Sequence, residues 1–106
     1  GYYGQWEKNV KKGKGVSFNT GDVVIYEGEF DSNLMDGQGV FYFTNGDKIE
    51  ATFVKNMREG PGTYYWKAGN VWKGGFKNNQ LHGTGPFTDA KGNTFTITFE
   101  NGKQKK

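Results

Sequence analysis

The sequence predicts an all-β fold, a single-layer antiparallel meander of repeated β-hairpins that is elongated and curved. A unit that is clearest at residues 26–48 recurs every 23 residues, and fixed periods of roughly 20 to 50 residues indicate stacked structural repeats. Within each unit, aromatic and polar residues alternate with the period of two that is typical of a half-buried strand. Asn-Gly or a related pair follows each unit, and no segment shows helical periodicity.

The register of the repeat follows from positions that recur in phase. They are Phe30, Phe53, Phe76 and Phe99; Asn33, Asn56 and Asn79; Gly37, Gly60 and Gly83; Gly39, Gly62 and Gly85; and Gly46, Gly69 and Gly92. The first copy is offset by 24 residues, because one extra residue lies within residues 23–25. Residues 1–106 therefore form one domain with copies at about 2–25, 26–48, 49–71 and 72–94 and a partial copy at 95–106. Each copy depends on its neighbours for stability.

Each copy predicts one hairpin and one joint to the next copy. In the second copy, residues 26–30 and 38–43 are the two strands, and residues 33–36 form the turn between them. Residues 44–47 are the joint, where Asn-Gly is expected to supply the positive φ angles of a type I′ turn. About nine strands would then span roughly 40 Å at about 4.8 Å per strand.

Two prolines and the last strand need separate treatment. A proline inside a central strand removes a ladder hydrogen bond, so we expect Pro61 and Pro86 to lie at a bend or bulge at the start of the second strand of their copies. Residues 94–99 alternate Thr with Phe95, Ile97 and Phe99. They form either an end strand or a strand that awaits a missing partner.

The alternation assigns the two faces of the sheet. Tyr26, Gly28 and Phe30 point to an aromatic face, whereas Glu27 and Glu29 point to a face in water. The central Gly leaves a space that we expect an aromatic ring from a neighbouring strand to fill. The candidates are Phe41, Phe43, Tyr64, Trp66 and Phe87.

A family resemblance rests on these same positions. The second copy contains Tyr-Glu-Gly-Glu-Phe at 26–30, Gly-x-Gly at 37–39, an aromatic stretch and Asn-Gly-Asp at 45–47, and the pattern covers essentially the whole chain. It resembles the MORN repeat (membrane occupation and recognition nexus). The departures from the family pattern are Ala51, Pro61, Pro86, Asp89 and Ile97. The resemblance implies a scaffold like those attached to kinases, methyltransferases, junctional membrane proteins and ciliary or cytoskeletal proteins, or a binder of lipid headgroups.

The residues that catalysis would need are scarce. The chain has no Cys and one histidine, His82, so neither a His pair for zinc nor a Ser-His-Asp arrangement with a second candidate exists. Asp36 and Glu59 fall at the tips of successive hairpins, without the burial that shifts a carboxyl pKa. The Gly-Lys-Gly segment at 13–15 lacks the continuation of a phosphate-binding loop. We expect no enzyme activity, no metal and no cofactor.

Positive charge gathers at one predicted hairpin tip, at Lys8, Lys11, Lys12 and Lys14. These lysines are the candidate contacts for an anionic phospholipid such as a phosphoinositide or phosphatidic acid, and the alternative is that they only solubilise the tip. The net charge is +3, without the continuous basic stripe of a nucleic-acid binder. We therefore expect no nucleic-acid partner.

The aromatic face is the main candidate for function. Exposed apolar patches mark binding surfaces, and Tyr and Trp are enriched at binding hot spots. We expect a peptide or helix of a protein partner to bind a groove with Tyr26, Phe43, Tyr64, Trp66 and Trp72 as anchors. The alternative is that these rings only pack against one another.

Two further expectations concern the whole chain. Unpaired terminal strands are templates for pairing with another chain, which predicts homo-oligomers. The absence of Cys and of a signal peptide favours an intracellular, cytoplasmic location, and the resemblance adds the cytoskeleton or the periphery of a membrane.

Overall fold

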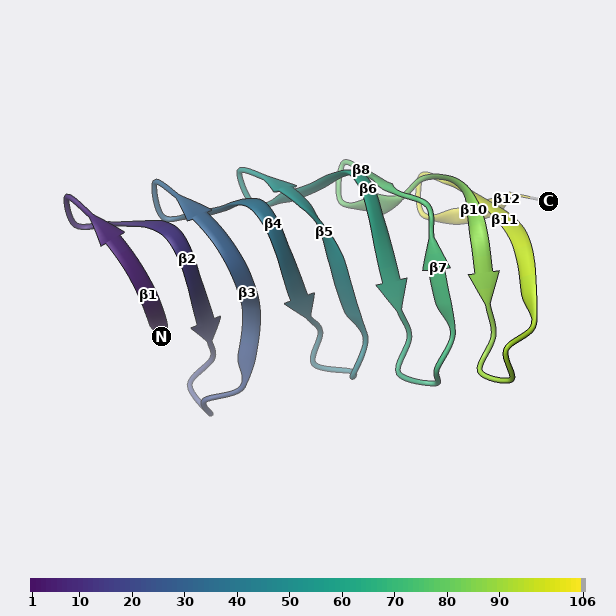
Figure 1. Cartoon of the computed structure of the whole chain (residues 1–106), viewed down its shortest axis with the longest axis horizontal. Coiled ribbons are helices and arrows are strands. Elements are labelled where there is room, and N and C mark those ends of the chain that lie inside the picture. Colours follow the sequence, from purple (N-terminus) through teal and green to yellow (C-terminus); the bar gives the residue numbers. More distant parts are fainter. Residues whose placement is uncertain (106) are drawn as a thin grey trace.

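The structure, a computed structural model, describes residues 1–105 as one antiparallel sheet without a helix. Its strands are β1 (Tyr2–Glu7), β2 (Val10–Phe18), β3 (Val24–Asp31), β4 (Leu34–Tyr42), β5 (Lys48–Val54), β6 (Met57–Tyr65), β7 (Val71–Lys73), β8 (Phe76–Lys77), β9 (Gln80–Leu81), β10 (Gly83–Thr88), β11 (Thr94–Glu100) and β12 (Lys103–Lys105). Figure 1 shows the strands side by side in chain order, with hairpin tips along one edge and joints along the other. The predicted meander is confirmed, and its extents are 48 × 25 × 17 Å.

The fourth copy differs from the others because both of its strands are interrupted. Gly74 and Gly75 separate β7 from β8, and His82 separates β9 from β10. At the corresponding position the earlier copies have Gly4 followed by Gln5, Gly28 followed by Glu29, and Ala51 followed by Thr52. Two consecutive glycines remove the side-chain packing that favours a continuous strand. The short strand β12 was not predicted.

The hairpin tips are two-residue turns in which both residues have positive φ. Ser32 has φ 50° and Asn33 has φ 72°, and the same pair of angles recurs at Lys55 and Asn56. This is the type I′ geometry that matches the twist of the flanking strands. The type I′ turn was expected at the joints, which is wrong. At each joint a single residue has positive φ, either a glycine such as Gly46 with φ 99° or, at the first joint, Asp22 with φ 60°.

The recurring asparagines connect successive hairpin tips. The side-chain oxygen of Asn56 accepts the Met35 N–H at 2.8 Å, and the Asn56 N–H donates to the Met35 carbonyl oxygen at 2.8 Å. Asn33 makes the same pair of bonds to Lys11, and Asn79 makes it to Arg58. Asparagine at this slot therefore serves both the turn and the contact between copies.

Register shifts mark the level at which the strands bend. Between β3 and β4 the shift lies at Gly28 to Phe30, and between β5 and β6 it lies at Ala51 and Thr52. Pro61 follows Gly60, whose φ is 74°, at the second shift, so the predicted bulge is confirmed, but it lies inside β6 and not at the start of the strand. Pro86 instead pairs with Thr96 in regular register. The prediction of a bulge at Pro86 is therefore wrong.

The core is a layer of aromatic rings that lie flat on the sheet. The Tyr26 hydroxyl donates to the Glu29 carbonyl oxygen at 2.9 Å, so its ring runs along its own strand over Gly28. A Cβ added at Gly39 would approach the Tyr26 ring to 2.4 Å. Trp72 lies against Gly74 in the same way. The rings over Gly28 and Gly74 thus come from two residues earlier in the same segment and not from a neighbouring strand, whereas Gly39 and Gly62 are covered by Tyr26 and Phe76 of neighbouring strands.

The rings also cover one another along the array. Tyr26 makes edge-to-face contacts with Phe30 and Phe53, at centroid distances of 5.1 and 5.0 Å. Tyr26, Trp72 and Phe53 are each no more than 1 % exposed. Flat rings in mutual contact allow one sheet to bury a core without a second layer. Within residues 1–105, no helix is long and apolar enough to cross a membrane.

Candidate functional site

A broad hollow lies on the face opposite the aromatic core. It has a volume of about 770 Å³ and crosses β1 to β5. Its floor includes the backbone of Gly15, Gly28 and Gly39, and its side chains include Val16, Val40, Glu27, Glu29, Glu50 and Lys14. We call this hollow the trough. A second hollow shares Gln38, Glu50 and Ala51 with it and continues along the array to Lys73 and Gly74.

A straight row of side chains runs along the trough because the strands pair in register. The cross-strand pairs are Val16 with Glu27, Glu27 with Val40, Val40 with Glu50 and Glu50 with Thr63. Directly opposite residues in an antiparallel sheet share one face, so this central row alternates valine and glutamate. Val16 and Val40 are partly exposed, and Glu27 and Glu50 are exposed.

Hydrogen bonds connect the carboxylates of the trough to the sheet. The Tyr42 hydroxyl donates to Glu27 at 3.5 Å, and the Tyr65 hydroxyl donates to Glu50 at 3.2 Å. Glu29 accepts the Gln38 N–H at the bend. Burial and the adjacent carboxylates raise the pKa of both tyrosines. The trough therefore presents oriented negative charge beside valine side chains.

The predicted aromatic anchors divide into two groups. Tyr26 and Trp72 are fully buried, so in this conformation neither can touch a partner. Phe43, Tyr64 and Trp66 are partly exposed. They belong to a continuous aromatic strip with centroid distances of 4.4 to 6.0 Å, formed by Phe41, Phe43, Tyr64, Trp66 and Phe87. Beside Trp66 the strip adjoins a hollow of about 610 Å³ whose other lining residues are Asn45, Asp47, Lys67, Ala68 and Asn70.

Polar groups support the aromatic strip from below. The Asp47 carboxylate accepts the Tyr64 hydroxyl at 2.6 Å and the Lys67 N–H at 2.8 Å. These bonds hold the pKa of Asp47 below its ordinary value. The Arg58 guanidinium lies 5.7 Å from the Phe43 ring and 5.9 Å from the Phe76 ring. Asp47 and Arg58 therefore stabilise the strip and the core.

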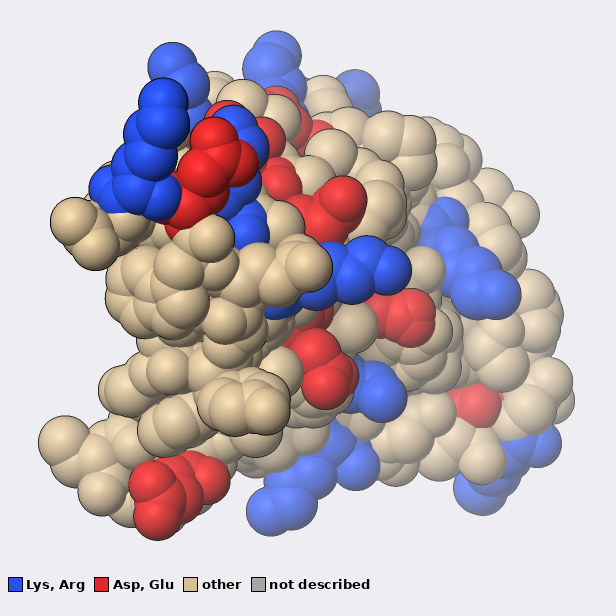
Figure 2. Space-filling model, turned by 60° about the vertical axis from the view of Figure 1, so that its left-hand side comes forward, with Lys and Arg blue, Asp and Glu red and all other residues tan. Residues whose placement is uncertain are grey.

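The four candidate lipid-binding lysines do not form one patch. Lys11 lies over the Tyr2 ring at 5.0 Å, and Lys12 pairs with Asp31 at 3.5 Å. Lys14 lines the trough, and Lys8 lies in the first hairpin turn with φ 50°. Figure 2 shows acidic side chains among the basic ones at the nearest hairpin tips.

The candidate catalytic residues are dispersed. The His82 ring nitrogen Nδ1 accepts the Asn101 N–H at 3.4 Å, and a Glu59 oxygen accepts the Asn78 N–H at 3.1 Å. Both bonds join neighbouring hairpins. Within residues 1–105, no three His, Cys, Asp or Glu side chains gather in a way that could hold a metal ion.

The sequence of the chain matches a known protein family. The family model of the MORN repeat matches four times, at residues 2–23, 26–48, 50–71 and 72–94, which together make up most of the chain. The chain belongs to the MORN repeat family. MORN repeats are non-enzymatic modules that in general mediate protein and membrane interactions. No curated protein matches this chain.

The trough was not predicted from the sequence, because the aromatic face of the MORN array was the main candidate for function. A signal for it exists in the register of the repeat. Glu27 and Glu50 share one slot, as do Val16 and Val40 once the extra residue in the first copy is counted. Such recurrence predicts a row of like side chains across the sheet, but not that the sheet is hollowed there.

Proposed function

We propose that this MORN array is a non-catalytic interaction module that binds a peptide or helix of a protein partner in the trough. The observation that carries the proposal is the hollow itself, of about 770 Å³, with partly exposed valines on a sheet that lacks a second layer. Binding sites of this kind are concave and mostly apolar, with a few placed polar groups.

The aromatic face supports the proposal by holding the sheet in shape, and not by contacting the partner as expected. Tyr26 packs on Phe53 and Trp72 packs on Phe99. Because these core rings are buried by the chain itself, the sheet holds its shape without a ligand. A preformed surface loses little conformational entropy on binding. The array therefore has a rigid frame on one side and an open trough on the other.

Binding of displayed helical peptides tests the proposal. Peptides are selected against the wild-type chain, and their affinities are then measured for two variants. Val40→Lys places a charged side chain at the centre of the trough, between Glu27 and Glu50. Trp66→Ala removes the centre of the aromatic strip.

We expect Val40→Lys to abolish binding of the selected peptides while its melting temperature stays near that of the wild type, since Val40 lies on the open face. Trp66→Ala is expected to leave their affinity within about twofold, because contacts outside an interface are nearly neutral. If Trp66→Ala abolishes binding and Val40→Lys does not, the partner surface is the aromatic strip and the trough proposal fails.

A further inference from the structure

The charges of the trough indicate the chemistry of its occupant. Three carboxylates line it, those of Glu27, Glu29 and Glu50, against the single ammonium group of Lys14. Glu29 is already used in the bond to Gln38, whereas Glu27 and Glu50 are exposed and have only tyrosine hydroxyl donors. A partner that buries these two carboxylates without supplying positive charge would leave unpaired charges.

The backbone of the trough favours one conformation of the occupant. Its floor is formed by strands β2, β3 and β4, each paired on both sides. Their ladders therefore use the N–H and C=O groups. An extended segment lying across the strands would find no partners for its own backbone groups, which is costly once they leave water. An α-helix satisfies those groups internally and presents only side chains.

The spacing of the central row matches the pitch of a helix. Glu27 and Glu50 lie on β3 and β5, two strand spacings apart, which is about 10 Å. Seven residues of an α-helix also rise about 10 Å, so residues i and i+7 lie on one side of it at this distance. Val40 lies between the two carboxylates, where it faces the turn that carries residues i+3 and i+4.

We propose that the trough binds a basic amphipathic α-helix, with Lys or Arg at positions i and i+7 paired to Glu27 and Glu50 and an apolar residue at i+3 or i+4 on Val40. This assignment rests on the proposed function of the trough and adds the class of partner. Val16 extends the apolar contact by one more turn toward the N-terminal end of the array. Lys14 lies at that end, where it favours an acidic or neutral residue of the helix.

Two synthetic helices of about 18 residues, long enough to hold helical structure, test the assignment. One has Lys at i and i+7 with Leu at i+3 and i+4, and the other has Glu in place of each Lys. Their affinities are measured by fluorescence anisotropy for the wild type, for Glu27→Gln with Glu50→Gln, and for Val40→Lys. Glu27→Gln and Glu50→Gln keep an oxygen for Tyr42 and Tyr65.

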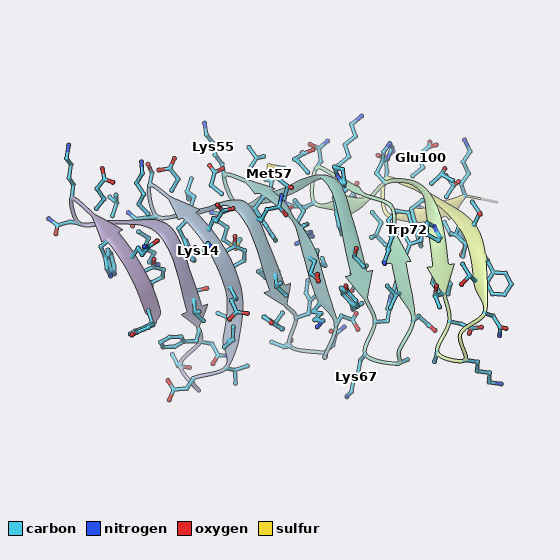
Figure 3. All side chains as sticks on the ribbon, in the orientation of Figure 1. Lys14, Lys55, Met57, Lys67, Trp72 and Glu100 are labelled. Atoms are coloured by element: carbon cyan, nitrogen blue, oxygen red, sulfur yellow. The ribbon has the colours of Figure 1, made fainter. Side chains whose placement is uncertain are left out.

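Glu100→Gln provides the matched control. Glu100 carries an exposed carboxylate that pairs with Lys105 at 3.3 Å. It lies at the other end of the array from Lys14, as Figure 3 shows. Its replacement removes one negative charge, as each of the two trough substitutions does, without touching the trough.

We expect the basic helix to bind the wild type more tightly than the acidic helix. The double substitution should weaken the basic helix by about tenfold, the combined effect of two exposed ion pairs. A higher salt concentration should also weaken binding of the basic helix. Glu100→Gln should leave the affinity unchanged.

The results that overturn the assignment are separable from those that overturn the proposed function. If the acidic helix binds as tightly as the basic one and both lose binding in Val40→Lys, the trough binds helices but the charge assignment is wrong. If neither helix binds the wild type while selected peptides still depend on Val40, the assignment is again wrong alone. If no peptide of any kind responds to Val40→Lys, the proposed function itself fails.

Discussion

At the residue scale, glycine decides whether the aromatic layer can form. The rings of Tyr26 and Trp72 lie directly on Gly39 and Gly74, with no space for a methyl group. The recurrence of these glycines was visible in the sequence, and so was the need for a ring to fill the space. The source of the ring was not, because strand periodicity gives the face of a side chain but not its rotamer.

Gly28→Ala tests this packing. A Cβ at Gly28 would lie 2.5 Å from the Gln38 carbonyl oxygen and 2.5 Å from the Gly39 Cα, both backbone atoms that cannot move aside. Overpacking of this kind costs about 1 to 3 kcal/mol. We expect thermal unfolding to show a lower midpoint for Gly28→Ala. In Gly21→Ala, the control, the nearest atom would be at 3.5 Å; equal midpoints for both variants would disprove the account.

The lowered pKa of Asp47 should make the free energy of unfolding depend on pH. Bonds from Tyr64 and Lys67 lower its pKa in the folded chain. Its contribution to stability is therefore present above the unfolded pKa of about 3.9 and is lost as the pH falls through the folded value. Asp47→Asn should lose less stability than the wild type between pH 5 and pH 2, as measured by urea unfolding. Asp22→Asn, at an exposed turn position, should follow the wild type.

At the element scale, each hairpin is held by its tip as well as by its strands. The antiparallel order and the bulge at Pro61 were predicted, since alternation and proline chemistry are local properties. The second strand of the second copy was expected at residues 38–43 after a turn at 33–36, whereas β4 already begins at Leu34 after the two-residue turn. The type I′ turn was expected at the joints because of Asn-Gly at residues 45–46, whereas Ser32 and Asn33 at the hairpin tip form it. The bonds from each asparagine to the preceding copy join residues more than 20 positions apart, which local pattern does not reveal.

Two substitutions at Asn56 separate its two roles. Asn56→Gly keeps the positive φ of 73° but removes the side-chain bond to the Met35 N–H, for which we expect a loss of about 1 kcal/mol. Asn56→Ala also strains the backbone, which adds about 1 to 2 kcal/mol. Chemical denaturation measures both. Equal losses for Gly and Ala would mean that the turn geometry contributes nothing.

At the scale of the whole molecule, the array is a sheet whose two faces differ in structure. The aromatic face holds the sheet together, and the opposite face is hollowed along its length. Composition and the repeat pattern predicted a single-layer sheet. They did not decide which face binds a partner, because side chains suited to binding lie on both faces. The trough depends on bends at the register shifts of several strands together, and these bends are a property of the assembled sheet.

The unpaired edge of strand β1 leads us to expect self-association. It pairs with β2 on one side and with no strand of the described chain on the other, and its side chains Tyr3 and Trp6 are 80 % and 56 % exposed. Open edges with apolar side chains pair with other chains. We expect the average mass measured by light scattering to rise with concentration, and Tyr3→Lys to suppress the rise. A constant monomer mass at high concentration would contradict this prediction.

The central claim, that partners bind the trough, is tested most directly by mapping a bound peptide on the backbone amides. The ¹⁵N-labelled chain is titrated with the tightest peptide selected against the wild type, and amide shifts are recorded in two-dimensional NMR spectra. The account predicts that the largest shifts fall on Val16, Glu27, Val40 and Glu50. Shifts that instead gather on Phe43, Tyr64 and Trp66 would place the partner on the aromatic strip and contradict the account.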